Sequence, residues 1–168
     1  MKYPSIKMTL KIILLSAILL TSLNPVYAAK VGSEAPNLYG RTLSGELFRL
    51  KSVPGNKLVN FFWIECAPCT KEIPELKALE DKYPKIRVVA VHVNEKDEDK
   101  VTVQQFVSKL KAAPDTIVLS SSLVKDVFSF AAFPYTVLIG DDGKIKATFT
   151  GYFGKKSMAK LEAAIQKL

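Results

Sequence analysis

The sequence has few of the side chains from which metal sites are usually built. It contains one histidine, two cysteines and three methionines among 168 residues. A zinc site needs three or four protein ligands, whereas Cys66 and Cys69 supply only two. The simpler interpretation of His92, at a strand end, is a core residue and not a metal ligand or a catalytic base. Met158, on the apolar stripe of the last expected helix, is also more simply a core residue. We therefore expect no metal and no cofactor.

The sequence also lacks clusters of basic residues. Lysine and arginine outnumber aspartate and glutamate by 24 to 16, but they are nowhere interleaved with aromatic residues as in nucleic-acid-binding surfaces. The first 28 residues hold three basic and no acidic residues, which leaves 21 basic against 16 acidic residues, a net charge of +5. We expect no nucleic-acid partner, and solubility explains this mild charge more simply than docking to acidic surfaces.

No apolar run reaches the about 20 residues that a membrane-spanning helix needs. The run at residues 12–23 instead belongs to a pattern typical of a secretory signal peptide. It is preceded by the basic residues Lys2, Lys7 and Lys11. It is followed by Val26-Tyr27-Ala28, which places small residues at the −3 and −1 positions of a cleavage site. We expect cleavage after Ala28.

Cleavage there divides the chain into a signal peptide, residues 1–28, and one mature domain, residues 29–168. The alternative is a retained N-terminal membrane anchor. No cysteine lies near the cleavage site, so a lipid anchor on cysteine is excluded. The expected location is the periplasm. The mature length suffices for one domain with a sizeable core, and there is no internal repeat, low-complexity tract or second domain.

What the chain does have is a Cys-x-x-Cys motif, Cys66-Ala67-Pro68-Cys69, between an apolar run at 58–64 and a helical pattern at 71–83. A cysteine at a helix N-terminus is favoured as the thiolate by the helix dipole and by unpaired N–H groups. Disulfides can be structural in exported proteins. A disulfide that closes so short a loop constrains the unfolded chain very little. The spacing therefore favours reversible redox chemistry.

The remaining pattern is that of a mixed α/β protein. Residues 37–50 predict a hairpin with its turn at Ser44-Gly45. Buried strands are expected at 58–64 and 86–93, and further strands at 116–119 and 135–139. Helices are expected at 71–83, 103–110, 122–130 and at the end of the chain. A helix between two apolar strands indicates a parallel βαβ unit, and Pro74 should kink the first helix without ending it.

Two more patterns assign faces near the C-terminus. After the turn at 140–143, the residues on one face of an antiparallel strand are expected to be Ile145, Ala147 and Phe149. The closing helix is expected to bury one stripe made of Met158, Leu161, Ile165 and Leu168.

This order of elements resembles the thioredoxin fold, and more closely the TlpA/ResA-like branch of exported thiol-disulfide oxidoreductases. The matching segments are residues 31–36, 60–63, 66–76 and 134–145, and the resemblance extends over residues 31–168. It implies an α/β fold in which helices flank a central mixed sheet, with an N-terminal β-hairpin. A helix-containing insertion between Val93 and Thr116 also fits that branch.

The resemblance also implies roles for individual residues. Cys66 would be the attacking thiol and Cys69 the buried resolving thiol. Pro134 would follow a cis peptide bond, and Phe133 would offer its backbone for strand-like pairing with a partner. Gly151 would form the third wall of the substrate groove. Ala67 and Pro68, between the cysteines, would tune the redox properties of the pair.

Several positions depart from that family. Glu65 stands where the family usually has Trp, and a carboxylate beside Cys66 should raise the pKa of its thiol and make the couple more reducing; alternatively, Glu65 points into solvent with little effect. Asn60 replaces the buried Asp of thioredoxin and cannot titrate, which leaves the proton acceptor for Cys69 unassigned. Glu72 and Glu75 are expected to be surface charges. Phe133, bulky for its position, is expected to pack with neighbouring aromatic residues.

The resulting hypothesis is an exported thiol-disulfide oxidoreductase that reduces protein disulfides. Its partners would be protein disulfide substrates and an upstream electron-donor thiol protein, for which a membrane reductase is one candidate. Cytochrome c maturation is a common role in this family. The alternatives are a disulfide oxidase or isomerase, and a non-catalytic thioredoxin-like binding module. A peroxidase is disfavoured because Trp63 stands where peroxidases of this superfamily have Thr or Ser.

Overall fold

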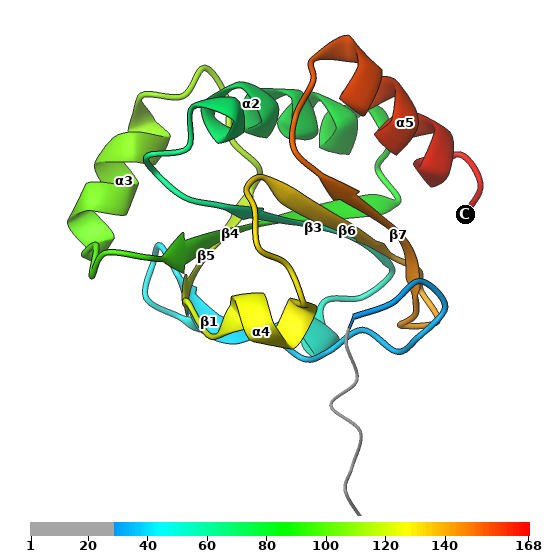
Figure 1. The fold of residues 1–168 in the computed structure, drawn as a ribbon, viewed down its shortest axis with the longest axis horizontal. Helices are drawn as coiled ribbons and strands as arrows, with labels where there is room; N and C mark the ends of the chain where they lie inside the picture. Colours follow the sequence, from blue (N-terminus) through cyan, green and yellow to red (C-terminus); the bar gives the residue numbers. More distant parts are fainter. Residues whose placement is uncertain (1–28) are drawn as a thin grey trace, which may run out of the picture.

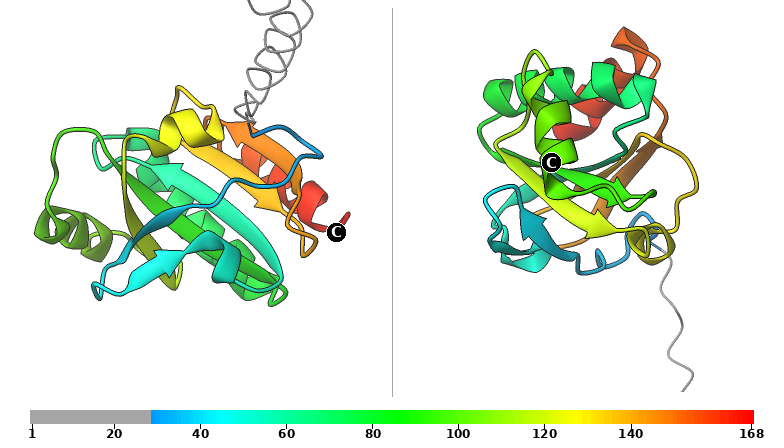
Figure 2. Two further views of the ribbon diagram at one scale, coloured as in Figure 1. Left: turned by 90° about the horizontal axis from the view of Figure 1, so that it is seen from below. Right: turned by 90° about the vertical axis from the view of Figure 1, so that its left-hand side faces the viewer.

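The computed structural model describes residues 29–168 and shows one seven-stranded sheet covered by helices on both faces (Figures 1 and 2). The strands are β1 (Tyr39–Thr42), β2 (Leu47–Arg49), β3 (Asn56–Phe62), β4 (Ile86–Asn94), β5 (Thr116–Ser121), β6 (Tyr135–Ile139) and β7 (Ile145–Thr150). Their order in the sheet is β2-β1-β5-β4-β3-β6-β7. The α-helices are α2 (Ala67–Lys82), α3 (Lys100–Ser108), α4 (Val124–Phe128) and α5 (Lys155–Ile165), and η1 (Leu50–Ser52) is a 3-10 turn.

The helices are divided unequally between the two faces of the sheet. Helices α2, α3 and α5 lie on one face, and α4 lies on the other together with the N-terminal segment (Figure 1). This is the thioredoxin-like architecture that the sequence predicted, with a mixed sheet, an N-terminal hairpin and an inserted helix, α3, between β4 and β5. The signal-peptide prediction concerns residues 1–28, which lie outside the described residues. Within residues 29–168, no helix has the length and apolar character needed to cross a bilayer.

Strand β3 is the centre of the sheet because it is buried on both faces. Its neighbours are β4, with which it pairs in parallel, and β6, with which it pairs antiparallel. Val59 and Phe61 face the core on the α4 side, whereas Leu58 faces Leu76 of α2 and Leu161 of α5. Burying each such side chain is worth about 1.5–3 kcal/mol. The unbroken apolar run of β3 is therefore what a two-sided core requires.

The hairpin of β1 and β2 extends the sheet beyond β5. The turn closes with the Gly45 N–H bonded to the Thr42 carbonyl at 2.9 Å, so its centre lies at Leu43-Ser44, one residue before the predicted Ser44-Gly45. Strand β1 pairs antiparallel with β2 and β5. A side chain at Gly40 could not be accommodated, because a Cβ there would lie 2.5 Å from the backbone oxygen of Leu119. The glycine thus permits the close approach of β1 to β5.

The prediction that Ile145, Ala147 and Phe149 share one face of β7 is partly wrong. The pairing of β6 with β7 shifts register between Leu138 and Ile139, so that Leu138 pairs with Ala147 and Ile139 with Ile145. Such an irregularity reverses the alternation of side chains along the strand. Ile145 therefore packs in the core on the α4 side, whereas Ala147 and Phe149 pack against the core under α2 and α5.

The stripe of the closing helix is also shorter than predicted. Leu161 and Ile165 are buried and Met158 is partly buried, but α5 ends at Ile165 and Leu168 beyond it is exposed. A periodic pattern cannot show that the last apolar residue lies past the end of the helix. Helix α2, in contrast, continues through Pro74 to Lys82, as expected.

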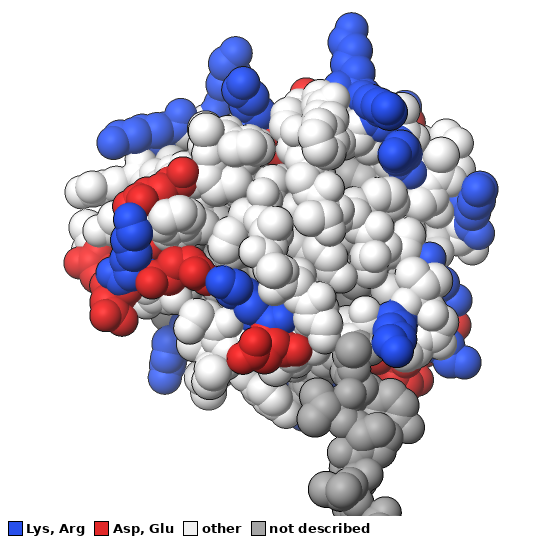
Figure 3. Space-filling model, viewed as in Figure 1, with Lys and Arg blue, Asp and Glu red and all other residues white. Residues whose placement is uncertain are grey.

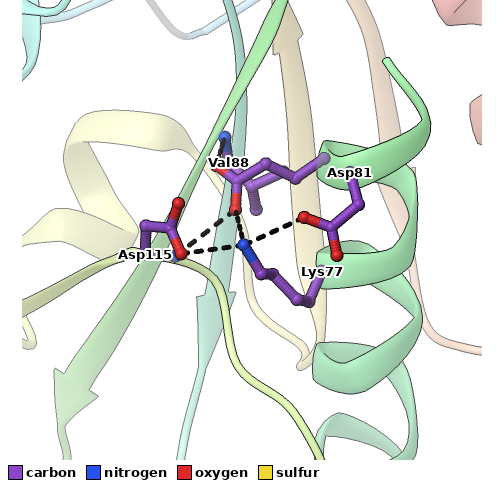
Figure 4. A network of polar contacts seen from close by, with 5 residues as sticks. Lys77, Asp81, Val88 and Asp115 are labelled. Carbon is purple, nitrogen blue, oxygen red and sulfur yellow. Dashed lines mark hydrogen bonds and ion pairs between the residues drawn. The ribbon is translucent and has the colours of Figure 1, made fainter. Parts of the chain in front are cut away.

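A buried carboxylate fastens α2 to the sheet. Glu80 accepts hydrogen bonds from the backbone N–H groups of Val88 at 3.0 Å and Asp115 at 3.3 Å. Lys77, one turn earlier, lies 3.5 Å from Glu80 and also pairs with Asp81 and Asp115 (Figure 4). The hydrogen bonds that Lys77 donates to Asp115 and Asp81 raise the pKa of Lys77. This network links the C-terminal half of α2 to β4 and to the segment before β5, and so fixes that end of the helix over the sheet.

We expect Glu80→Ala to lower the free energy of unfolding by about 2–3 kcal/mol, because the buried Val88 N–H group loses its acceptor. Urea unfolding followed by Trp63 fluorescence measures the change. The matched control is Asp81→Ala, which removes an exposed partner of Lys77 and should cost less than about 0.5 kcal/mol. Equal losses for the two variants would contradict a specific role for the buried carboxylate.

Candidate active site

Cys66 stands at the N-terminus of α2, as the sequence predicted. It is the N-cap residue, and its Sγ accepts a hydrogen bond from the Cys69 N–H group at 3.2 Å. The two cysteines form a disulfide. Cys66 is 8% exposed and Cys69 is fully buried, so Cys66 is the sulfur that a partner reaches first. The unpaired N–H groups of the first helical turn stabilise negative charge at this position.

The disulfide lies on an apolar base. Phe62, Ile73, Ala90 and Ile117 pack around the two cysteines, and Phe133 lies at the edge of this cluster. Ala67 and Pro68, between the cysteines, are exposed. The base is supplied by β3, β4, β5 and α2, so the position of the disulfide is fixed by the centre of the sheet.

The loop before β6 lies beside the disulfide. The Phe133–Pro134 peptide bond is cis, as the resemblance implied. Phe133 packs edge-on against Phe130 with ring centres 5.6 Å apart, which confirms the predicted aromatic packing. Gly151, at the end of β7, donates its N–H to the Pro134 carbonyl at 2.8 Å. The structure thus brings together Phe133, Pro134 and Gly151, which the sequence assigned to one groove.

Glu65 lies apart from these groups and is paired with a lysine. Its Oε2 atom is 2.6 Å from Nζ of Lys96 in the loop after β4. Lys96 also lies over the ring of Trp63, 5.0 Å from its centre, and the Trp63 indole N–H donates to Glu98. The sequence left open whether Glu65 acts on Cys66 or points into solvent. The carboxylate is half-exposed, and Lys96 offsets part of its charge.

The prediction that Glu72 is a surface charge is wrong. The residue is 2% exposed, and its Oε2 accepts a hydrogen bond from Nδ2 of Asn60 at 2.8 Å. Asn60 also donates to Oγ1 of Thr136 on β6 at 2.9 Å. Glu72 follows Cys69 by three residues, a spacing that places both on the same face of α2. Glu75 is also more than a surface charge, because its carboxylate accepts a hydrogen bond from the Tyr152 hydroxyl at 2.8 Å.

Burial makes Glu72 a group that can take up and release a proton near neutral pH. Desolvation raises its pKa from 4.5 to about 7, against the opposing effect of the Asn60 hydrogen bond and with a smaller contribution from the charge of Glu75. Glu72 also lines a cavity of about 200 Å³ between β7 and α5. The other lining residues include the polar residues Thr148, Thr150, Ser157 and Lys160. Glu72 is therefore the candidate proton acceptor that the sequence left unassigned.

His92 takes no part in this arrangement. It is 1% exposed and lies edge-on to Phe62 with ring centres 5.6 Å apart. Desolvation lowers its pKa, partly offset by the charge of Glu98. This is the strand-end core residue that the sequence predicted. Within residues 29–168, the histidine, cysteine, aspartate and glutamate side chains form no cluster of three or more that could hold a metal ion.

Two cysteines that form and break a disulfide can exchange it with the thiols or the disulfide of another molecule. This thiol-disulfide exchange needs no further reagent. Their position at the N-terminus of a helix, beside a cis-proline loop, is built on a thioredoxin-like sheet. The protein is a thiol-disulfide oxidoreductase of this fold.

Comparison with known proteins gives the family. The Redoxin family model matches residues 30–165, and the chain belongs to that family. The thiol-disulfide oxidoreductase ResA of Bacillus subtilis is 30% identical over 148 residues, which are 83% of this chain and 80% of the relative. ResA of Halalkalibacterium halodurans is 29% identical over 126 residues, 73% and 70% of the two chains.

A solved structure shows the same fold. It is that of a Chlorobium tepidum protein described as a thiol:disulfide interchange protein DsbE, with a TM-score of 0.74 and 19% sequence identity. The match covers 83% of this chain and 98% of that chain. The solved structure confirms the fold, and the relatives named ResA confirm the resemblance to ResA-like oxidoreductases.

The raised pKa of Glu72 predicts a pH dependence of stability. The folded carboxyl binds its proton more tightly than the unfolded one, so this stabilisation is complete below pH 4.5 and is lost as the pH rises through about 7. The total loss is on the order of 3 kcal/mol. Glu72→Gln should flatten this part of the profile, measured as urea unfolding of the oxidised protein between pH 4 and 8.

The exposed Glu46 of the hairpin supplies the control for this experiment. Glu46→Gln should leave the pH profile of the wild-type protein unchanged. If Glu72→Gln retained the same decrease in stability between pH 4.5 and 7, the dependence would arise from other groups and the assignment to Glu72 would be wrong.

Proposed function

We propose that this protein is an exported reductase of protein disulfides that works through Cys66 and Cys69. The observation that carries the proposal is the order of three side chains along α2. Cys66, the more exposed of the two cysteines, caps the helix, and the buried Cys69 and the buried Glu72 follow it. The first sulfur can attack, the second can resolve, and Glu72 can accept the proton that the second must lose.

The reaction starts from the dithiol form. The Cys66 thiolate attacks one sulfur of a client disulfide, and the other client sulfur leaves as a thiolate. The Cys69 thiol then transfers its proton to the Glu72 carboxylate and attacks the Cys66 sulfur. The second client thiolate is released, and the Cys66–Cys69 disulfide remains. Two electrons have passed to the client, and a donor thiol protein must return them before the next cycle.

The reducing direction follows from two carboxylates. Glu65 precedes Cys66, and Glu72 lies one turn beyond Cys69 in a desolvated site. Both disfavour further negative charge near the sulfurs. A couple whose thiolates are less stabilised is a stronger reductant. The N-terminus of α2 acts in the opposite sense, so a disulfide oxidase or isomerase is the second candidate.

We propose that the client lies along the groove formed by Phe133, Pro134 and Gly151. Phe133 packs against the cluster that contains the disulfide, and the loop before β6 would offer backbone groups with which an extended client segment can pair. The supporting observation is the hydrogen bond from Gly151 to Pro134, which holds two walls of the groove together. Clients in cytochrome c maturation are one class that the ResA-like resemblance suggests.

The proposed export rests on the N-terminal pattern, a basic segment followed by a short apolar run and Val26-Tyr27-Ala28. The domain boundary is accordingly proposed between residues 28 and 29. We expect N-terminal sequencing of the protein recovered from a periplasmic extract to begin at Ala29. A chain that begins at Met1 in the membrane fraction would instead support the retained anchor.

The enzymatic test uses single cysteine substitutions. We expect Cys66→Ser to abolish the reduction of a model protein disulfide, because no attacking thiolate remains. Cys69→Ser should instead accumulate a mixed disulfide between Cys66 and the client, because the resolving thiol is missing. This intermediate is detected by non-reducing electrophoresis and mass spectrometry. Turnover that survives in Cys66→Ser would contradict the assigned role.

The reduction potential of the pair decides the direction. Trp63 fluorescence in defined thiol buffers should give a value near or below about −250 mV, the range of thioredoxin-like reductants. Glu65→Gln should make the potential less negative, because it removes a charge beside Cys66. A wild-type value between about −180 and −120 mV would place the protein with isomerases and oxidants and would exclude the reductase proposal.

A further inference from the structure

A second hollow lies directly beside the residues between the two cysteines. This cavity of about 400 Å³ is bordered on one side by the start of α2 and on the other by the loop between β7 and α5. It is lined by Ala67, Pro68, Lys71, Tyr152, Phe153 and Gly154. A side chain bound here would sit next to the disulfide but outside the groove formed by Phe133, Pro134 and Gly151.

The loop that forms one wall of this cavity is held at three points. Gly151 donates its N–H to the Pro134 carbonyl at 2.8 Å, which ties the loop to the segment before β6. The Tyr152 hydroxyl donates to Glu75 at 2.8 Å, which ties it to α2. The Phe153 N–H donates to Oγ of Ser157 at 2.8 Å, which ties it to α5. The wall is thus fixed before any partner arrives.

Phe153 nevertheless points its ring into solvent, and 75% of the residue is exposed. The ring lies against Gly151, where a Cβ would be only 3.2 Å from a ring carbon. Gly151 also has a φ of +77°, a region that side chains disfavour. The glycine therefore determines both the turn and the place of the ring. A large apolar side chain in a fixed position beside a reactive centre can contribute strongly to binding when a partner covers it.

The charge around the cavity is one-sided. Lys71 is its only charged lining residue, and within residues 29–168 no carboxylate lies within ion-pair distance of it. Figure 3 shows a broad uncharged area on the face seen in Figure 1, with acidic side chains gathered on the left, where β4 ends, and basic side chains along the upper edge.

We propose that this cavity binds a bulky apolar side chain of the client polypeptide, close to its reacting cysteine, and that Lys71 favours an acidic residue beside it. Phe153 is then a specificity-determining residue of the reaction. The inference rests on the proposed function and adds to it the class of client sequence. The occupant is a client segment because the cavity adjoins Ala67 and Pro68, which a polypeptide bonded to Cys66 must pass.

The test uses short peptides whose single cysteine carries a thionitrobenzoate group in disulfide linkage. Attack by the reduced enzyme on the peptide sulfur releases coloured thionitrobenzoate, and Cys69 then releases the peptide thiol. One neighbour of the cysteine is Phe or Gln, and the other neighbour is Asp or Lys. Each combination is made in both orders, so that every residue is tested before and after the cysteine. For wild type we expect kcat/KM about tenfold higher with Phe than with Gln, the effect of one buried aromatic contact.

Phe153→Ala should remove the preference for Phe, and Phe153→Leu should retain part of it. Neither variant should change the rate with hydroxyethyl disulfide, which has no peptide, no aromatic ring and no charge, by more than about twofold, since Phe153 does not act on the sulfurs. Lys71→Glu should reverse the preference for Asp over Lys. The matched control is Tyr39→Ala, an equally exposed aromatic residue on β1 that does not line the cavity.

Three outcomes would overturn the proposal. An unchanged preference for Phe in Phe153→Ala would show that the cavity is not used. An equal loss with peptides and with hydroxyethyl disulfide would show that Phe153 acts through the fold or the disulfide. A dimeric wild type that becomes monomeric in Phe153→Ala, measured by sedimentation, would assign the surface to a second copy. A wild type that reduces none of these disulfides would instead refute the proposed function.

Discussion

The burial of β3 on both faces is the constraint on which the site depends. A strand with apolar contacts above and below cannot slide or tilt without loss of two cores, so its C-terminal end is a fixed point. The chain turns there into α2, and Cys66 becomes the cap of that helix. The position of the reactive sulfur is therefore determined by packing around Leu58, Val59 and Phe61, residues that have no chemical role. The carboxylate of Glu80, near the opposite end of α2, ties this helix to β4.

Beneath the disulfide, the protein tolerates a carboxyl group where apolar packing would be more stable. Burial of Glu72 costs free energy at neutral pH, and only Asn60 donates a hydrogen bond to it among the described side chains. Thioredoxin places an acidic residue at the position of Asn60, on the strand. Here the acid is on the helix, and the strand residue has become its donor. The two arrangements supply the titratable group from different elements of the same unit, either the strand before the Cys-x-x-Cys motif or the helix after it.

The elements around the cysteines could be predicted because each follows from a short pattern of apolar residues, turns and helix ends. What could not be predicted depended on pairing between distant segments. Ile145 changed face because β7 shifts register against β6. Glu65 meets Lys96 through a loop 31 residues away. Glu72 is different, because its three-residue spacing from the inward-facing Cys69 already placed it on the buried face of α2. The charged residue type favours the surface, whereas the position of Glu72 on α2 decides for the core.

The hairpin of β1 and β2 determines which edges of the sheet an extended polypeptide can reach. Without it, β5 would be the border of the sheet and would offer its backbone groups to any extended polypeptide. With it, the outermost strand on that side is β2, which has three residues, ends in Arg49 and leads into the 3-10 turn. On the opposite border, β7 carries Lys146 at its register irregularity. The sheet thus offers few edge positions to which an extended polypeptide could add a strand.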